Sequence, residues 1–226
     1  MPRQSRIVAP GVAHHVTQRG TDCQKVFYAR RDRGVYLDLL RLESERAGLD
    51  ILAYCLMPNH IHVLCVPEGE ESLAICFRRT HGRYAQYLNA RRQRSGHLWQ
   101  NRFYSCPLDD AHLWTALRYI ELNPVRAGLV ANAEDFPFSS AAAHLSGRDL
   151  ARILDMEFWK GSGRDRSWAE MLKIEQNEAD RKALRKATYA GRPFGSEEFV
   201  QRWNRPNAVE KTTQIAPQWK IAGEIY

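Results

Sequence analysis

The chain has no long hydrophobic run. None of its apolar segments approaches the roughly 20 residues that a membrane-spanning helix needs, and its first residues lack the apolar core of a secretory signal. The five cysteines are scattered among 226 residues and include no Cys-x-x-Cys pair, a pattern that favours reduced thiols over a disulfide framework. We therefore expect a cytoplasmic protein.

Acidic residues are absent from one long stretch. Between residues 72 and 108 there is no Asp or Glu, whereas seven arginines occur there, at positions 78, 79, 83, 91, 92, 94 and 102. A solvated helix face usually mixes both signs, because like charges repel one another. The whole chain carries a net charge of +7. The stretch therefore indicates contacts with a nucleic-acid backbone, and its interleaved aromatic rings either stack on bases or pack in the core.

Hydrophobic periodicity predicts alternating strands and helices. We expect strands over 13–20 and 98–108, a β-hairpin over 49–66, and helices over 32–47, 71–94 and 109–123. Basic residues 1–12 are expected to form an arm. Residues 150–186 are helix-prone, a short helix is expected to begin at Ser196, and residues 204–226 have the composition of a flexible tail.

Two histidines open the second strand of the expected hairpin, in the segment MPNHIHVL. Side chains alternate along a strand, so His60 and His62 share one face while Ile61 takes the other. Two imidazoles placed in this way can bind one cation, or they can be ordinary polar residues of a half-exposed strand. A zinc site with Cys55 and Cys65 is a further alternative. Against it, Cys65 falls on the face opposite the histidines.

A second pair of polar residues is expected at the end of the 109–123 helix. Tyr119 and Asn123 lie one turn apart on a flank of its apolar stripe. Pro124 disfavours helical geometry at Asn123, so the helix is expected to end or kink there. Partial negative charge at a helix C-terminus would favour a cation near Asn123. Alternatively, Tyr119 is a half-buried residue and Asn123 only a helix terminator.

The segments MPNHIHVL and RYIELNPVRAGLV, in this order, resemble the single-tyrosine transposases of the HUH endonuclease superfamily. The opening MPRQSRIVAPGVAHHVTQRG and the later GRPFGSEEFVQR are similar to the REP-associated tyrosine transposases in particular. The resemblance covers residues 1–146 as a catalytic domain and leaves 147–226 as a helical extension and flexible tail. It implies an α+β fold: a ferredoxin-like antiparallel sheet with helices on its faces, the histidines on a central strand and the tyrosine on a helix across from it.

The resemblance also implies roles for individual residues. His60, His62 and Asn123 would bind a divalent metal ion, Mg²⁺ or Mn²⁺, and Tyr119 would be the nucleophile. Tyrosine has an ordinary pKa near 10 and is a weak nucleophile at neutral pH, so a cation that stabilises charge on the phosphate oxygens would assist the attack. The products would be a 5′-phosphotyrosine and a free 3′-hydroxyl. Arginines expected at the DNA are Arg3, Arg6, Arg19, Arg78, Arg79, Arg83, Arg102 and Arg118.

We therefore expect a metal-dependent endonuclease and strand transferase that acts on single-stranded DNA, at or near hairpin-forming repeats, in association with the nucleoid. One alternative is a domesticated hairpin-binding protein that no longer cuts, against which the intact tyrosine, histidines and asparagine weigh. Another is a replication- or conjugation-type HUH nickase, whose histidine motif tends to be richer. The protein would be a monomer or a homodimer. The tail would either cover the DNA groove or only aid solubility.

Overall fold

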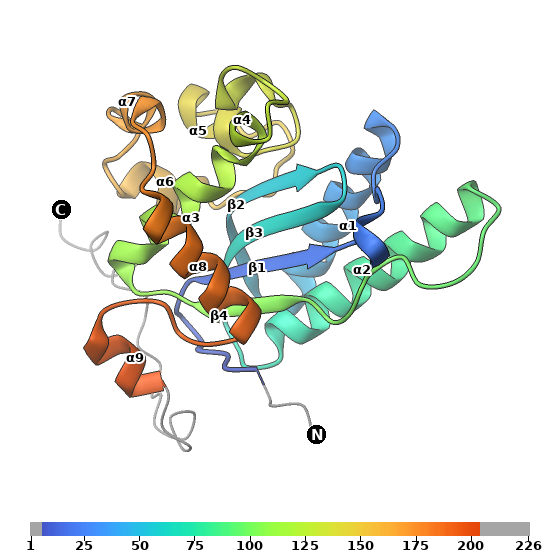
Figure 1. Ribbon diagram of the computed structural model, residues 1–226, viewed down its shortest axis with the longest axis horizontal. Helices are drawn as coiled ribbons and strands as arrows, with labels where there is room; N and C mark the ends of the chain where they lie inside the picture. Colours follow the sequence, from blue (N-terminus) through green and yellow to red (C-terminus); the bar gives the residue numbers. More distant parts are fainter. Residues whose placement is uncertain (1–5, 204–226) are drawn as a thin grey trace.

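A four-stranded antiparallel sheet forms the centre of the fold (Figure 1). The computed structural model describes residues 6–203, and Arg3 and the expected tail from 204 onward lie outside them. The strands are β1 (His14–Arg19), β2 (Leu49–Met57), β3 (His60–Pro67) and β4 (Tyr104–Pro107), in the spatial order β2-β3-β1-β4. Helix α1 (Arg30–Ala47) joins β1 to β2, and α2 (Ser72–Arg91) joins β3 to β4. This is the ferredoxin-like β-α-β-β-α-β plan, so the predicted fold class is confirmed.

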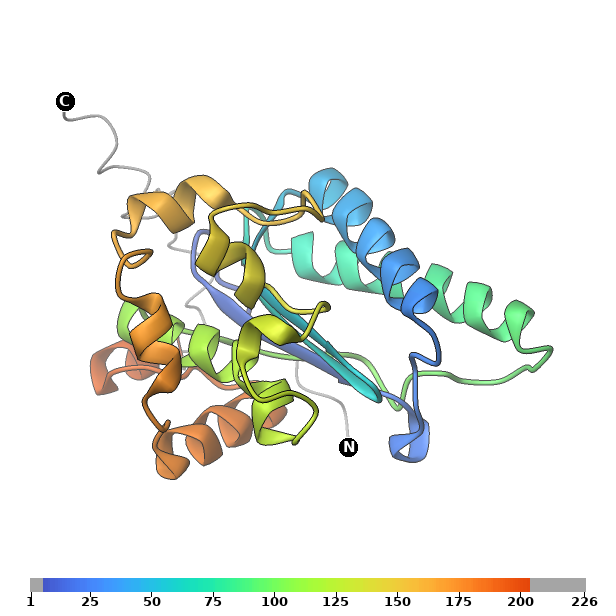
Figure 2. The ribbon, with the colours of Figure 1, turned by 90° about the horizontal axis from the view of Figure 1, so that it is seen from above.

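The two faces of the sheet bury separate cores. Helices α1 and α2 cover one face, while α3 (Asp110–Glu121) and α8 (Glu178–Ala190) cover the other (Figures 1 and 2). Strand β3 supplies both cores through its two-residue period: Ile61 and Val63 pack toward α1 and α2, whereas Leu64 and Val66 pack toward α3. His60 and His62 therefore lie on the α3 side of a central strand, as the sequence predicts.

Most of residues 147–203 pack on the same side of the sheet as α3, whereas Ala151, Ile153 and Leu154 join the core on the α1 and α2 side. This segment forms α6 (Met156–Gly161), α7 (Trp168–Lys173), α8 and α9 (Glu197–Trp203), after the short α4 (Asn123–Arg126) and α5 (Ala141–Ser146). Trp159, Trp168 and Leu184 are almost fully buried in the core that α3 also enters. Each such side chain stabilises the fold by about 1.5–3 kcal/mol. No helix in the described range 6–203 is both long and apolar enough to cross a membrane.

Two predicted boundaries differ from the structure. The strand expected over 98–108 is reduced to β4, because Trp99 turns toward α2, where its indole N–H donates to the His81 carbonyl at 3.1 Å. The helix expected to reach Asn123 ends at Glu121, and Asn123 begins α4. Pro124 fits the first turn of α4 because its missing N–H would have no partner there. The predicted break before Pro124 is therefore present, although the chain continues as a second helix.

Candidate active site

The fold brings the two predicted polar pairs together on one face of the sheet. Tyr119 comes from α3, which crosses β3 where His60 and His62 begin that strand. The ring centroids of His60 and His62 are 4.9 Å apart, and those of His62 and Tyr119 are 5.4 Å apart with the rings nearly perpendicular. His62 and Tyr119 are only 5% and 6% exposed. The site is therefore a mostly buried cluster, with His60 at its more open side.

Both histidines are neutral near pH 7. Burial lowers the pKa of His60 to about 4, with a smaller contribution from the Arg19 guanidinium. Burial also lowers the pKa of His62 well below its ordinary value, and the neighbouring His60 and His15 rings act in the same direction. Neutral imidazole is the form that binds metal ions, because one ring nitrogen keeps its lone pair.

Each of these rings has one nitrogen in a hydrogen bond and the other free. The Nδ1 of His60 is 2.6 Å from Asn59 Oδ1, and the Nδ1 of His62 is 2.9 Å from His15 Nε2. Within the described part of the chain, neither Nε2 atom has a hydrogen-bond partner. Both rings can therefore offer Nε2 to a ligand.

Asn123 can complete this donor set. Asn123 begins α4 shortly after α3 ends, and its amide nitrogen Nδ2 is buried without any partner in the range 6–203. Two neutral imidazole nitrogens and one amide oxygen suit Mn²⁺ or Mg²⁺ and leave positions for phosphate and water. The residues present thus fit the divalent cation that the sequence implies.

The zinc alternative finds no support in the geometry. Cys65 belongs to the core on the α1 and α2 side, opposite the histidines. Cys55 lies beside His62 in the strand register, but burial raises the pKa of its thiol and so disfavours the thiolate that zinc binds. Across residues 6–203, no group of three or more His, Cys, Asp and Glu side chains is placed to hold a metal ion.

Two arginines that were not predicted for the site surround Tyr119. Burial raises the pKa of the Tyr119 hydroxyl, whereas the Arg126 and Arg185 guanidinium groups lower it. The guanidinium carbon of Arg126 is 4.5 Å from the centre of the Tyr119 ring, and its Nη2 donates to the Tyr119 carbonyl at 2.5 Å. Arg126 lies two helical turns after Tyr119, a spacing that could have indicated it. Arg185 comes from α8, and no local pattern connects it with the site.

The predicted DNA-binding arginines fall into three groups. Arg19 lies close enough to the histidines to lower the pKa of both. Arg6, Arg78 and Arg102 line one cavity of about 320 Å³ beside Phe77, Trp99 and Phe103. Arg6 also donates to the Phe103 carbonyl at 3.0 Å. The remaining described arginines make protein contacts too: Arg79 and Arg83 pair with Glu43 at 3.6 and 2.7 Å, and Arg118 donates to the Ile174 carbonyl.

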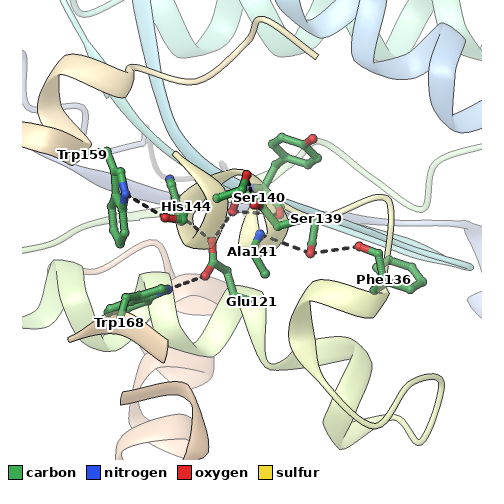
Figure 3. Close-up of polar contacts among 11 residues, drawn as sticks. Glu121, Phe136, Ser139, Ser140, Ala141, His144, Trp159 and Trp168 are labelled. Carbon is green, nitrogen blue, oxygen red and sulfur yellow. Dashed lines mark hydrogen bonds and ion pairs between the residues drawn. The ribbon is translucent and has the colours of Figure 1, made fainter. Parts of the chain in front are cut away.

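The end of α3 that carries Tyr119 is held by a buried carboxylate, Glu121 (Figure 3). Its Oε1 accepts a hydrogen bond from the Ser140 hydroxyl at 2.5 Å and lies 2.6 Å from His144 Nδ1. Its Oε2 accepts from the Trp168 indole N–H at 2.7 Å. Because these partners come from α5, with its capping residue Ser140, and from α7, Glu121 fixes the end of α3 relative to both helices.

Replacing Glu121 with alanine should lower the free energy of unfolding by about 3–5 kcal/mol, because the change leaves buried polar groups without their partner. Denaturant unfolding followed by circular dichroism measures this loss. Glu170→Ala is the matched control, since Glu170 is 74% exposed and pairs only with Lys173 on the surface. It should change the unfolding free energy by less than about 1 kcal/mol. Equal effects of the two substitutions would contradict the structural role of Glu121.

Comparisons with known proteins place the chain in a family. The family model described as transposase IS200-like matches residues 11–123. A Haemophilus influenzae protein named as a REP-associated tyrosine transposase is 33% identical over 129 residues, which cover 52% of this chain and 70% of the relative. The REP-associated tyrosine transposase of Escherichia coli K12 is 26% identical over 136 residues, 59% of this chain and 76% of that protein.

A solved structure shows the same fold. It is that of a REP-associated tyrosine transposase bound to a REP hairpin, and it superposes with a TM-score of 0.51 at 21% identity. The superposition covers 69% of this chain and 90% of the other. The family rests on the sequence matches, of which the family model spans the histidines and the tyrosine. The chain belongs to the IS200-like transposases and, within them, to the REP-associated tyrosine transposases.

Proposed function

We propose that this protein is a metal-dependent endonuclease and strand transferase that cleaves single-stranded DNA at or near hairpin-forming repeats. The proposal rests on one observation above all. The Tyr119 ring lies against the two neutral imidazoles on one face of the sheet, with 5.4 Å between the ring centroids of His62 and Tyr119 and 4.9 Å between those of His60 and His62. Its family relatives are transposases, which act on DNA in general.

His60, His62 and Asn123 would hold a Mg²⁺ or Mn²⁺ ion. When bound, the ion supplies Lewis-acid polarisation of the scissile phosphate. Tyr119 supplies the nucleophile: its Oη forms a bond to phosphorus, the bond from phosphorus to the 3′-oxygen breaks, and that oxygen leaves as a 3′-hydroxyl after gaining a proton. Arg126 and Arg185 lie beside Tyr119 and would offset the negative charge of the phosphate. The 5′-phosphotyrosine keeps the bond energy, so a 3′-hydroxyl can attack it and rejoin strands.

A covalent adduct tests this function. The full chain is incubated with Mn²⁺ and a single-stranded repeat that is labelled at either its 5′ or its 3′ end. A denaturing gel should show protein linked to the fragment that begins with the 5′ phosphate, together with a free 3′-hydroxyl fragment. A cut without any adduct would assign the nucleophile to water. Hairpin binding without a cut would support the non-cleaving alternative instead.

The arginines that line the cavity also give a prediction about DNA binding. Single strands and hairpins should bind more tightly than a blunt duplex, because their exposed bases can stack on the half-buried ring of Trp99 beside a basic groove. Arg78 and Arg102 are exposed at that cavity. Arg78→Ala with Arg102→Ala should weaken binding and reduce the slope of log affinity against log salt by about 0.7 per lost phosphate contact.

Fluorescence anisotropy at several salt concentrations measures both quantities. Arg41→Ala is the control, because Arg41 pairs with Glu45 on α1, away from the cavity. It should leave the affinity and the salt slope unchanged. An affinity that does not respond to salt, or equal binding of hairpin and blunt duplex, would contradict the proposed interface.

A further inference from the structure

His62 is one end of a chain of hydrogen bonds that starts in helix α8. Its Nδ1 lies 2.9 Å from Nε2 of His15, on the neighbouring strand β1. The other nitrogen of His15, Nδ1, lies 2.8 Å from Oγ1 of Thr188. Both His15 and Thr188 are buried, and they are 173 residues apart in the sequence. A residue near the end of the described chain therefore reaches the candidate metal site through one intermediate ring.

The direction of each hydrogen bond follows from the threonine. Thr188 Oγ1 donates its only proton to the Leu184 carbonyl, at 2.8 Å on the same helix, and the Cys106 thiol, whose Sγ lies 3.2 Å from the same oxygen, can donate to it. The hydroxyl oxygen can then only accept, so the proton between it and His15 belongs to His15 Nδ1. The His15 side chain is only 1% exposed, and in the described part of the chain its two ring nitrogens face a hydroxyl and an imidazole rather than a carboxylate, so the ring is neutral. Its Nε2 therefore carries a lone pair and accepts from His62.

This sequence of bonds determines which nitrogen of His62 is protonated. The proton lies on Nδ1, which donates to His15, and the lone pair lies on Nε2. The rings of His15 and His62 are nearly coplanar, with centroids 5.1 Å apart and planes at 14°, as an in-plane hydrogen bond between two imidazoles requires. His60 has the same protonation state without an intermediate residue, since its Nδ1 faces the side-chain oxygen of the adjacent Asn59.

We propose that Thr188 and His15 are positioning residues that fix the tautomer and the ring orientation of His62 for metal binding. The inference rests on the proposed function, because it assumes the metal ion of that site. It also assigns α8 to the catalytic unit, since α8 packs against β4 and β1 and carries Thr188 and Arg185. Loss of a hydrogen-bond partner behind a metal ligand typically weakens metal binding 10- to 100-fold.

Three substitutions test the inference. Thr188→Val removes the hydroxyl at nearly constant shape and should weaken Mn²⁺ binding about 10- to 100-fold. Thr188→Ser keeps the hydroxyl and should restore near wild-type affinity. Thr80→Val is the matched control, because Thr80 is a fully buried threonine of α2, on the other side of the sheet. It should leave Mn²⁺ affinity unchanged. Mn²⁺ alone is the probe, titrated into each full-length protein by electron paramagnetic resonance.

A second measurement does not depend on the metal. Long-range ¹H–¹⁵N NMR spectra should show the His62 proton on Nδ1 in the wild type, and on Nε2 or on both nitrogens in exchange in Thr188→Val. If Thr188→Val does not fold, His15→Phe interrupts the same chain while retaining a ring, and it should weaken Mn²⁺ binding similarly.

The outcomes separate the inference from the proposed function. A wild type that binds no Mn²⁺ would overturn the metal-dependent function, whatever the NMR spectra show. A wild type that binds Mn²⁺ while Thr188→Val binds it equally well would overturn only the positioning role. A wild-type His62 that carries its proton on Nε2 would likewise overturn only the positioning role.

Discussion

Replacing Tyr119 with phenylalanine should reduce DNA cleavage to background and abolish the covalent adduct. The substitution removes one oxygen, and a ring without a hydroxyl cannot form the phosphotyrosine. The shape of the side chain hardly changes, so the free energy of unfolding should change by less than about 1.5 kcal/mol. DNA affinity should also be retained, because Arg126 contacts the ring and the backbone carbonyl of Tyr119 rather than depending on its hydroxyl. The adduct gel and an anisotropy titration measure the two effects separately.

The sharpest control is Tyr189 on α8. From the sequence it lies outside the expected catalytic domain, but the structure places it near enough to influence the pKa of Tyr119, and it is 46% exposed. It is therefore the tyrosine that could replace Tyr119 as nucleophile. Tyr189→Phe should form the adduct as the wild type does. An adduct that persists in Tyr119→Phe and disappears in Tyr189→Phe would show that the nucleophile is Tyr189 on α8.

Much of the site could be predicted because it depends on local periodicity. The two-residue period of a strand places His60 and His62 on one face, and it separates Cys65 from them, as the two cores of the sheet show. Helical spacing places Tyr119 one turn before Asn123. The polar pairs meet because β3 is a central strand and α3 crosses its face, which the ferredoxin-like order of elements determines.

The other features of the site depend on contacts between segments that are distant in the sequence, and local patterns cannot predict such contacts. The arginine-rich stretch contains no acidic residue that could pair with its arginines. In the structure, however, Arg79 and Arg83 both pair with the buried Glu43 of α1, and Arg91 pairs with Asp32. Similarly, the adjacent histidines of β1 give only a weak signal. His14 points away and its Nδ1 lies 2.7 Å from the Val12 carbonyl, whereas His15 faces His62. Its role becomes visible only when α8 brings Thr188 to its other nitrogen.

Replacing both His60 and His62 with alanine should abolish cleavage and spare most DNA binding. In the proposed site these rings supply two of the three metal ligands, and the work of the ion falls on the charge that develops at the phosphate. Binding depends instead on phosphate contacts from arginines, which the substitutions leave in place. Asn123→Ala should reduce the cleavage rate less, because water can replace one neutral ligand.

The comparison is made by measuring cleavage and hairpin affinity of each variant with Mn²⁺ and again with EDTA. His112→Ala is the control, since His112 is a histidine near the start of α3 that pairs with Asp109 rather than facing the site. It should cleave as the wild type does. Cleavage by the wild type should disappear in EDTA and return with excess Mn²⁺, whereas excess Mn²⁺ should not rescue the double variant. The metal-dependent mechanism would be wrong if the double variant in EDTA cut DNA as fast as the wild type does with Mn²⁺. Tyr119 would then have to be activated by the surrounding arginines alone.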